Sequence, residues 1–154
     1  MTEQEYVASA RERATLLYLG DTVAHRSCGI ALAETFGLPP GSYQALRKGG
    51  LLGLGACGSI QAGVLILGEI LGEPLGGPTT ALKDAIPRYR ALVEAEVKGG
   101  VEASCNSRTQ AFADFGSRPR LEHCASLAAA AAAAVAATLW EAGRVREIPP
   151  APVR

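Results

Sequence analysis

Four cysteines carry the most distinctive chemistry in this chain, and they lie far apart in the sequence. They are Cys28, Cys57, Cys105 and Cys124, and each lies in a separate segment, most of them rich in alanine and glycine. No two form a CxxC pair, which excludes the local motif of thioredoxin-like enzymes, zinc ribbons and haem c attachment. Any site that they share must therefore be assembled by the fold.

The elements that would position these cysteines are helices. Apolar residues recur at helical spacing along residues 3–19, and no alternating run of residues indicates a sheet. A second helix over 23–36 would end at Gly37. We predict further helices over 54–71, 80–98, 101–115 and 119–142, a short turn over 42–48 and an interruption at Pro87. The expected fold is all-α, a single-domain helical bundle of about six helices.

Length, charge and the first residues narrow the class of protein. The 154 residues suit one domain over 1–148, followed by a proline-rich tail over 149–154. Lys and Arg together number 15, as do Asp and Glu, so we expect no nucleic-acid partner. The polar, charged start does not resemble a secretory signal, which favours the cytoplasm. Thiols stay reduced there, so structural disulfides are not expected.

Two uncharged segments, 51–68 and 124–140, approach the roughly 20 apolar residues that a membrane helix needs. Glycines interrupt the first, and the alanine run 128–134 makes the second only weakly hydrophobic. We therefore expect both to be buried helices of a soluble bundle, with no membrane partner.

Helical spacing places each cysteine on an apolar face, so four inward thiols are expected. Four thiolates suit a [2Fe–2S] or [4Fe–4S] cluster or another metal centre, although zinc-site cysteines usually come in closely spaced pairs. Alternatively, Cys57 and Cys28 could be the redox thiols of a cofactor-free dithiol, with Cys57 activated by a helix amino terminus. The cysteines could also be core residues of a non-enzymatic binding module. His25 and His123 are weaker candidates for metal ligands or proton acceptors.

The segments around the cysteines resemble a known family. The motifs are SCGIALAETFG at 27–37, GLGACGSIQAGVLILG at 53–68, Cys105 shortly before FADFG, and Cys124 at the start of the last alanine-rich helix. Together they resemble the C_GCAxxG_C_C family of redox-active proteins. A related domain accompanies the haem domain of split-Soret cytochromes and carries an iron–sulfur centre, although this chain has no CxxCH motif for haem.

The resemblance implies a helical redox or electron-transfer protein, and an oxidoreductase is one form that it could take. The cofactor would be an iron–sulfur cluster or other metal held by Cys28, Cys57, Cys105 and Cys124. We expect an unidentified redox partner, and a homodimer remains an open alternative.

Overall fold

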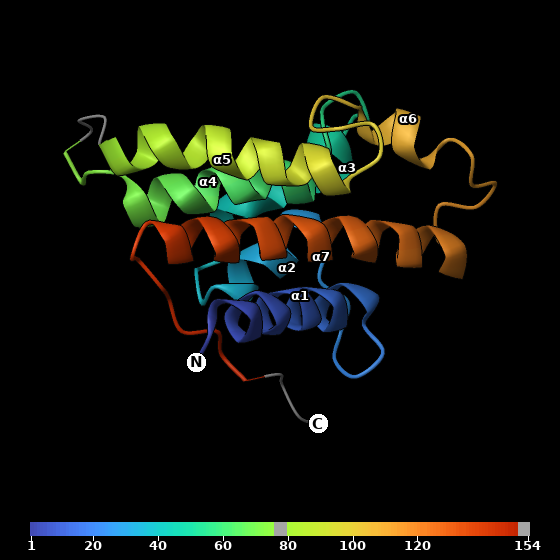
Figure 1. Ribbon diagram of the computed structural model, residues 1–154. Coiled ribbons are helices and arrows are strands. Elements are labelled where there is room, and N and C mark those ends of the chain that lie inside the picture. Colours follow the sequence, from blue (N-terminus) through green and yellow to red (C-terminus); the bar gives the residue numbers. More distant parts are fainter. Residues whose placement is uncertain (76–79, 151–154) are drawn as a thin grey trace.

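The computed structural model, which describes residues 1–75 and 80–150, is built of helices (Figure 1). The α-helices are α1 (Glu3–Leu19), α2 (Cys28–Thr35), α3 (Arg47–Gly50), α4 (Gly58–Leu71), α5 (Thr80–Glu96), α6 (Cys105–Thr109) and α7 (Arg118–Glu141), and a 3₁₀ helix (Gly41–Leu46) precedes α3. The described residues contain no strand, only an isolated bridge between Ala56 and Ser104. The predicted all-α fold is confirmed.

Helix α7 is the centre of the bundle. It packs against α1, α2, α4 and α5, and Figure 1 shows it running between α1 and the pair formed by α4 and α5. All seven residues of the alanine run Ala128–Ala134 are buried, and such small side chains allow neighbouring helix axes to approach closely. Among the described helices, α7 alone is long and apolar enough to span a membrane, but 72% of its most apolar window is buried inside the protein. A helix buried in the core of a folded protein meets the same criterion of length and hydropathy.

Helix α1 has the bounds that the sequence predicts, because both of its ends carry strong local signals. Thr2 and Glu5 form a capping box: the Glu5 amide donates to Thr2 Oγ1 at 3.2 Å, and the Thr2 amide donates to Glu5 Oε2 at 2.7 Å. Gly20 ends the helix in the left-handed conformation, with φ 74°. The buried stripe of α1 consists of Tyr6, Ala10, Ala14, Leu17 and Tyr18.

Several other helix boundaries differ from the prediction. The helix expected over 23–36 begins only at Cys28, so Ala24 and His25 do not share a helical face with that cysteine. The helix expected over 54–71 begins at Gly58, and the one expected over 101–115 is the five-residue α6. Helix α5 continues through Pro87 without the expected interruption.

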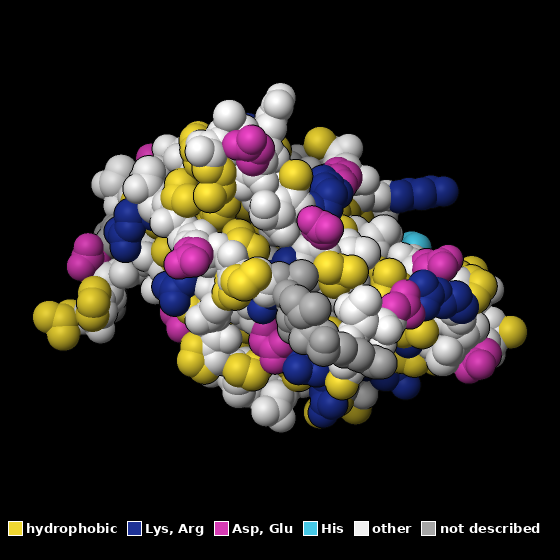
Figure 2. Space-filling view, turned by 90° about the horizontal axis from the view of Figure 1, so that it is seen from below, with side chains coloured by type: hydrophobic (Ala, Val, Ile, Leu, Met, Phe, Trp, Pro, Cys, Tyr) yellow, Lys and Arg dark blue, Asp and Glu magenta, His cyan; other side chains and the backbone are white. Residues whose placement is uncertain are grey.

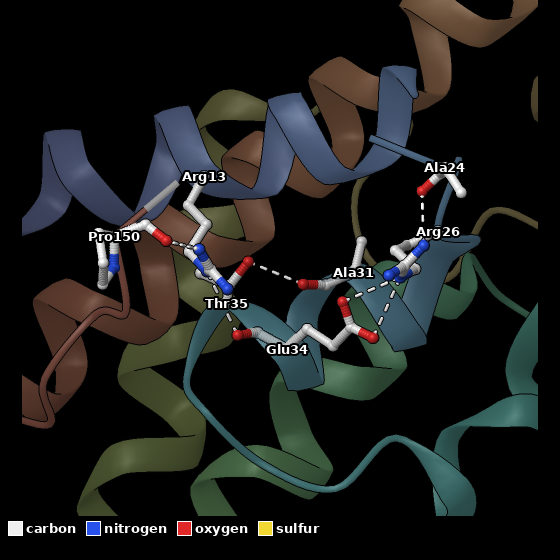
Figure 3. Close-up of polar contacts among 7 residues, drawn as sticks. All are labelled: Arg13, Ala24, Arg26, Ala31, Glu34, Thr35 and Pro150. Atoms are coloured by element: carbon white, nitrogen blue, oxygen red, sulfur yellow. Dashed lines mark hydrogen bonds and ion pairs between the residues drawn. The ribbon is translucent and has the colours of Figure 1, made fainter. Parts of the chain in front are cut away.

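The amino-terminal helices and the end of the chain are joined by polar contacts (Figure 3). Arg13 of α1 donates to the carbonyl oxygens of Glu34 and Pro150, and Arg26 forms an ion pair of 3.0 Å with the Glu34 carboxylate. Of the predicted tail, residues 149–150 lie near these helices, whereas 151–154 lie outside the described residues. Charges of both signs are interspersed on the face that Figure 2 shows.

Candidate metal centre formed by four cysteines

The fold brings all four cysteines to one small cavity. Its walls include Cys28, Cys57, Cys105 and Cys124, together with Gly58, Ser59, Arg108, Thr109 and Leu127. The space enclosed between these side chains is about 20 Å³. All four thiols are free; Cys57 is buried and the other three are half-buried. Four cysteines that are distant in the sequence therefore meet at one cavity.

Three of the four cysteines lie where a helix begins. Cys28 and Cys105 are the first residues of α2 and α6, Cys57 is the residue that caps α4, and Cys124 lies in the second turn of α7. The partial positive charge at the amino termini of α2 and α4 favours negative charge at Cys28 and Cys57.

Close backbone approach brings the segments that carry the cysteines together. A Cβ atom at Gly58 would lie 2.2 Å from the Leu46 carbonyl oxygen and 3.1 Å from Cys28 Cβ, so only glycine fits between α4 and the chain beside it. On the other side of the cavity, the Cys105 amide donates to the Gly55 carbonyl at 2.8 Å. The segment before Cys57 is thereby fixed against the segment that carries Cys105.

A left-handed turn completes the wall near Cys28. Lys48 (φ 49°, ψ 47°) and Gly49 (φ 57°, ψ 51°) are left-handed, and so is Leu51, with φ 71°. Consecutive left-handed residues are rare, because the conformation costs roughly 1–2 kcal/mol for each residue that carries a Cβ. Here the turn lets the Lys48 amide serve Cys28 as a hydrogen-bond donor, which favours the thiolate.

Burial nevertheless raises the pKa of three thiols, those of Cys28, Cys57 and Cys105. It raises the pKa of Cys28 to about 12, and the neighbouring Cys57 and Cys124 add to the effect. Burial also raises the pKa of Cys57, outweighing the backbone amides of Ile60 and Ser59, which favour the thiolate. The amides at the start of α4 thus lower the pKa of Cys57 as expected, but burial raises it by more, so the net shift is upward. This result counts against Cys57 as the attacking thiolate of a dithiol pair.

Two arginines lie beside the cysteines: Arg108 is half-buried and Arg120 is buried. Arg108 lines the cavity; its Nη1 donates to the Lys98 carbonyl at 2.9 Å, while its buried Nε has no hydrogen-bond partner. Its positive charge favours the thiolate of Cys57. Within residues 1–75 and 80–150, no carboxylate pairs with Arg108.

Arg120 is the second arginine and is only 6% exposed. Its Nη1 donates to the Tyr18 hydroxyl at 2.9 Å, and its guanidinium lies 3.9 Å from the centroid of the Phe115 ring. Arg120 and Cys124 are four residues apart on α7, and the guanidinium also faces the Cys124 sulfur. As with Arg108, none of the described carboxylates forms an ion pair with Arg120.

Neither histidine lines the cavity. His25 Nδ1 contacts the Tyr18 carbonyl, and its ring lies edge-on to the Tyr18 ring at 4.9 Å. His123 packs near Phe112, and burial lowers its pKa. Among the residues that the structure describes, no three His, Cys, Asp or Glu side chains are arranged to hold a metal ion. The four sulfurs thus surround one space without forming a ready single-ion site.

Sequence reasoning missed the cations and hydroxyls around the sulfurs. The spacing of Arg120 and Cys124, and of Cys105 and Arg108, could have revealed the two arginines, because residues three or four apart share a helical face. Tyr18 comes from a distant helix, so no local pattern indicates it.

Comparison with known proteins adds no relative to this picture: no family model, no curated protein and no solved structure matches the chain.

Proposed function

We propose that this protein is a redox protein whose four cysteines hold an iron–sulfur cluster for electron transfer. The observation that carries the proposal is the convergence of four free thiols, from four separate segments, on one cavity. Four cysteine thiolates are the common ligand set of both [2Fe–2S] and [4Fe–4S] clusters. When bound, such a cluster supplies one-electron redox chemistry. The resemblance to the C_GCAxxG_C_C family favours the same function.

The charges around the cavity support an anionic group there. A buried guanidinium without an anion is unfavourable, because burial removes its hydration. Arg108 and Arg120 are charged at any physiological pH, and the described residues offer neither of them a carboxylate. Thiolates of Cys57 and Cys124 would provide the missing negative charge.

The chemistry of four thiolates, rather than a preformed site, leads us to name a cluster instead of a single ion. A mononuclear site needs thiolate sulfurs about 2.3 Å from the metal, and no described group of side chains is arranged to hold one ion. A cluster distributes its cysteine ligands over several irons and so holds the sulfurs farther apart. The enclosed 20 Å³ is close to the space of one water molecule, so a cluster requires the cysteine side chains to turn outward.

The residues around the sulfurs have a definable role in this function. Hydrogen bonds to cysteine sulfurs and burial set the reduction potential of a cluster. The donors near the sulfurs are the amides of Lys48, Ser59 and Ile60 and the Arg120 guanidinium. They favour negative charge on the sulfurs, which stabilises the reduced state of a bound cluster.

Anaerobic purification followed by absorption spectroscopy and iron and sulfide analysis tests the proposal. We expect iron and sulfide in the protein, and a lower content of both when any one cysteine is replaced by serine. A second replacement should add much less than the first, because ligands of one cluster act as a unit. Serine is a close match in size, so folding is checked by circular dichroism on each variant.

If Cys28→Ser and Cys124→Ser both leave iron content, spectrum and redox titration unchanged, the four-cysteine centre is wrong. Absence of iron and sulfide, together with reversible formation of a Cys28–Cys57 disulfide, would instead favour the cofactor-free dithiol. Thiols that neither bind metal nor oxidise would leave the cysteines as core residues.

A further inference from the structure

Three leucines are exposed beside the cysteine cavity. Leu51, Leu52 and Leu54, in the loop between α3 and α4, are 56%, 75% and 74% exposed. We call residues 51–54 the leucine loop. Single exposed leucines are common on protein surfaces, but several exposed in one short segment mark an interaction site.

The fold holds the leucine loop in place. The Gly53 amide donates to the Lys48 carbonyl at 2.7 Å, and the Asn106 amide donates to the Gly53 carbonyl at 2.9 Å. A Cβ atom at Gly53, where φ is 77°, would lie 2.1 Å from Asn106 Oδ1, so the loop lies directly against α6. The exposed leucines therefore lie on a backbone whose conformation is fixed by hydrogen bonds.

This backbone also connects the leucine loop to two of the cysteines. Leu54 lies three residues before Cys57, and the intervening Gly55 accepts a hydrogen bond from the Cys105 amide at 2.8 Å. A molecule bound to the leucine loop would thus lie next to the wall of the cavity formed by Cys57 and Cys105.

The chain that leads into the leucine loop carries two cations. Arg47 and Lys48 are exposed and are separated from it by two glycines, and the sequence contains no Asp or Glu between Glu34 and Glu69. Lys48 Nζ lies 5.2 Å from the centroid of the Phe115 ring, and Arg47 Nε donates to the Gln44 carbonyl. In the described part of the chain, neither cation forms an ion pair.

We propose that the leucine loop, with Arg47 and Lys48, is the docking surface for an acidic electron-carrier protein. The inference rests on the proposed function, because position beside the cysteines matters only to a redox partner. An apolar centre next to unpaired cations fits a partner surface with an apolar patch and an acidic rim.

The size and charge of this surface argue against a second copy of the chain. Three leucine side chains are a fraction of the roughly 800 Å² that each partner contributes to a standard interface, whereas brief redox encounters use smaller surfaces. In a two-fold dimer built on the leucine loop, the like charges of Arg47 and Lys48 from both copies would be brought close to one another.

The test is calorimetric titration of the protein with an acidic [2Fe–2S] ferredoxin at low and high salt. We expect binding that weakens as salt rises. The Leu52→Ser, Leu54→Ser double variant should bind with at most about one tenth of the affinity of the unaltered protein. The control is Leu75→Ser, because Leu75 is 100% exposed and follows the opposite end of α4. That variant should bind as the unaltered protein does.

Two charge-reversal variants measure how much the positive charges contribute to binding. The Arg47→Glu, Lys48→Glu double variant should lose binding to ferredoxin, whereas Lys83→Glu, an exposed lysine on α5, should cause a much smaller loss. Basic cytochrome c serves as the probe of opposite charge and should not bind the unaltered protein.

The titration does not require a bound cluster, so it is distinct from the iron and sulfide analysis that tests the proposed function. Failure of ferredoxin to bind, or equal affinities in the leucine-loop and Leu75 variants, would overturn the proposal. It is also overturned if the leucine-loop variant instead abolishes a dimer seen by light scattering, or binding to phosphatidylserine vesicles.

Discussion

Replacing Gly58 by alanine tests the packing that holds the cysteine cavity together. A Cβ atom there would lie 2.2 Å from the Leu46 carbonyl oxygen, 3.0 Å from the Leu46 carbonyl carbon and 3.1 Å from Cys28 Cβ. The nearest of these atoms belong to the backbone, so no side chain can simply rotate away. Either Leu46 or the start of α4 must move, and the start of α4 borders the cavity through Gly58 and Ser59.

The expected loss of stability follows from two opposing effects. Overpacking of this kind costs about 1–3 kcal/mol. Alanine is more favourable than glycine within a helix by about 0.5–1 kcal/mol, and Gly58 is the first residue of α4, where this gain is smallest. We therefore expect Gly58→Ala to lower the free energy of unfolding by about 1–2 kcal/mol, or Tm by roughly 2–8 °C for a domain of this size.

Gly68→Ala on the same helix is the matched control. No heavy atom lies within 4 Å of a Cβ at Gly68, so only the gain in helix propensity remains. This variant should raise Tm by roughly 1–4 °C. Urea and thermal unfolding followed by circular dichroism measure both effects, and iron analysis shows whether Gly58→Ala also lowers metal content. A stabilising effect of Gly58→Ala equal to that of Gly68→Ala would refute the close approach of α4 to Leu46.

Three further outcomes are expected. In metal-free protein, the alkylation rates of Cys28 and Cys57, followed by mass spectrometry, should show pH midpoints above the ordinary 9.0, because burial raises both pKa values; a midpoint below 9.0 would contradict this. As the pH rises, the thiols of the unfolded chain lose their protons before the buried thiols of the folded protein do. The free energy of unfolding of metal-free protein, measured by urea titration, should therefore fall as the pH rises above about 9. An increase in this free energy would be inconsistent with the raised pKa values. Tyr18→Phe should shift the midpoint potential of the loaded protein, whereas Tyr6→Phe, which removes an equally buried hydroxyl of α1, should not; equal effects would show that Tyr18 acts only on stability.

The sequence predicts the helices best where local signals determine them, as the capping box and terminal glycine do for α1. It fails where tertiary contacts override helical spacing. The Arg26 amide donates to the Leu17 carbonyl at 2.8 Å, which draws the chain across the end of α1 and delays α2 until Cys28. Before α6, Ser104 pairs with Ala56 as an isolated bridge, so the helix cannot start at Val101.

The candidate site, like the fold, has features that the sequence predicts and others that it does not. The sequence predicts that Cys28, Cys57, Cys105 and Cys124 come together if they share a site, because one bundle has one core. It does not predict their protonation, since a helix amino terminus suggests a lower pKa for Cys57 and only the three-dimensional burial shows that the pKa is raised.

The alanine run of α7 has a consequence for where Cys124 lies along the helix axis. Successive alanines present nearly the same surface at every step, so their packing hardly distinguishes the observed register from one displaced by a turn, or about 5.4 Å. The register is fixed instead by larger buried side chains of α7, such as Val135 and Leu139, and by polar contacts near its ends. These contacts are Arg120 on Tyr18 at 2.9 Å, Arg118 on Asp21 at 2.7 Å and Glu141 on Arg88 at 2.8 Å. Exposed ion pairs contribute little, so Arg120 is the main axial anchor among these polar contacts. Sliding by one turn would carry Cys124 out of the cavity, and Arg120 thereby helps to hold the fourth thiol beside the other three.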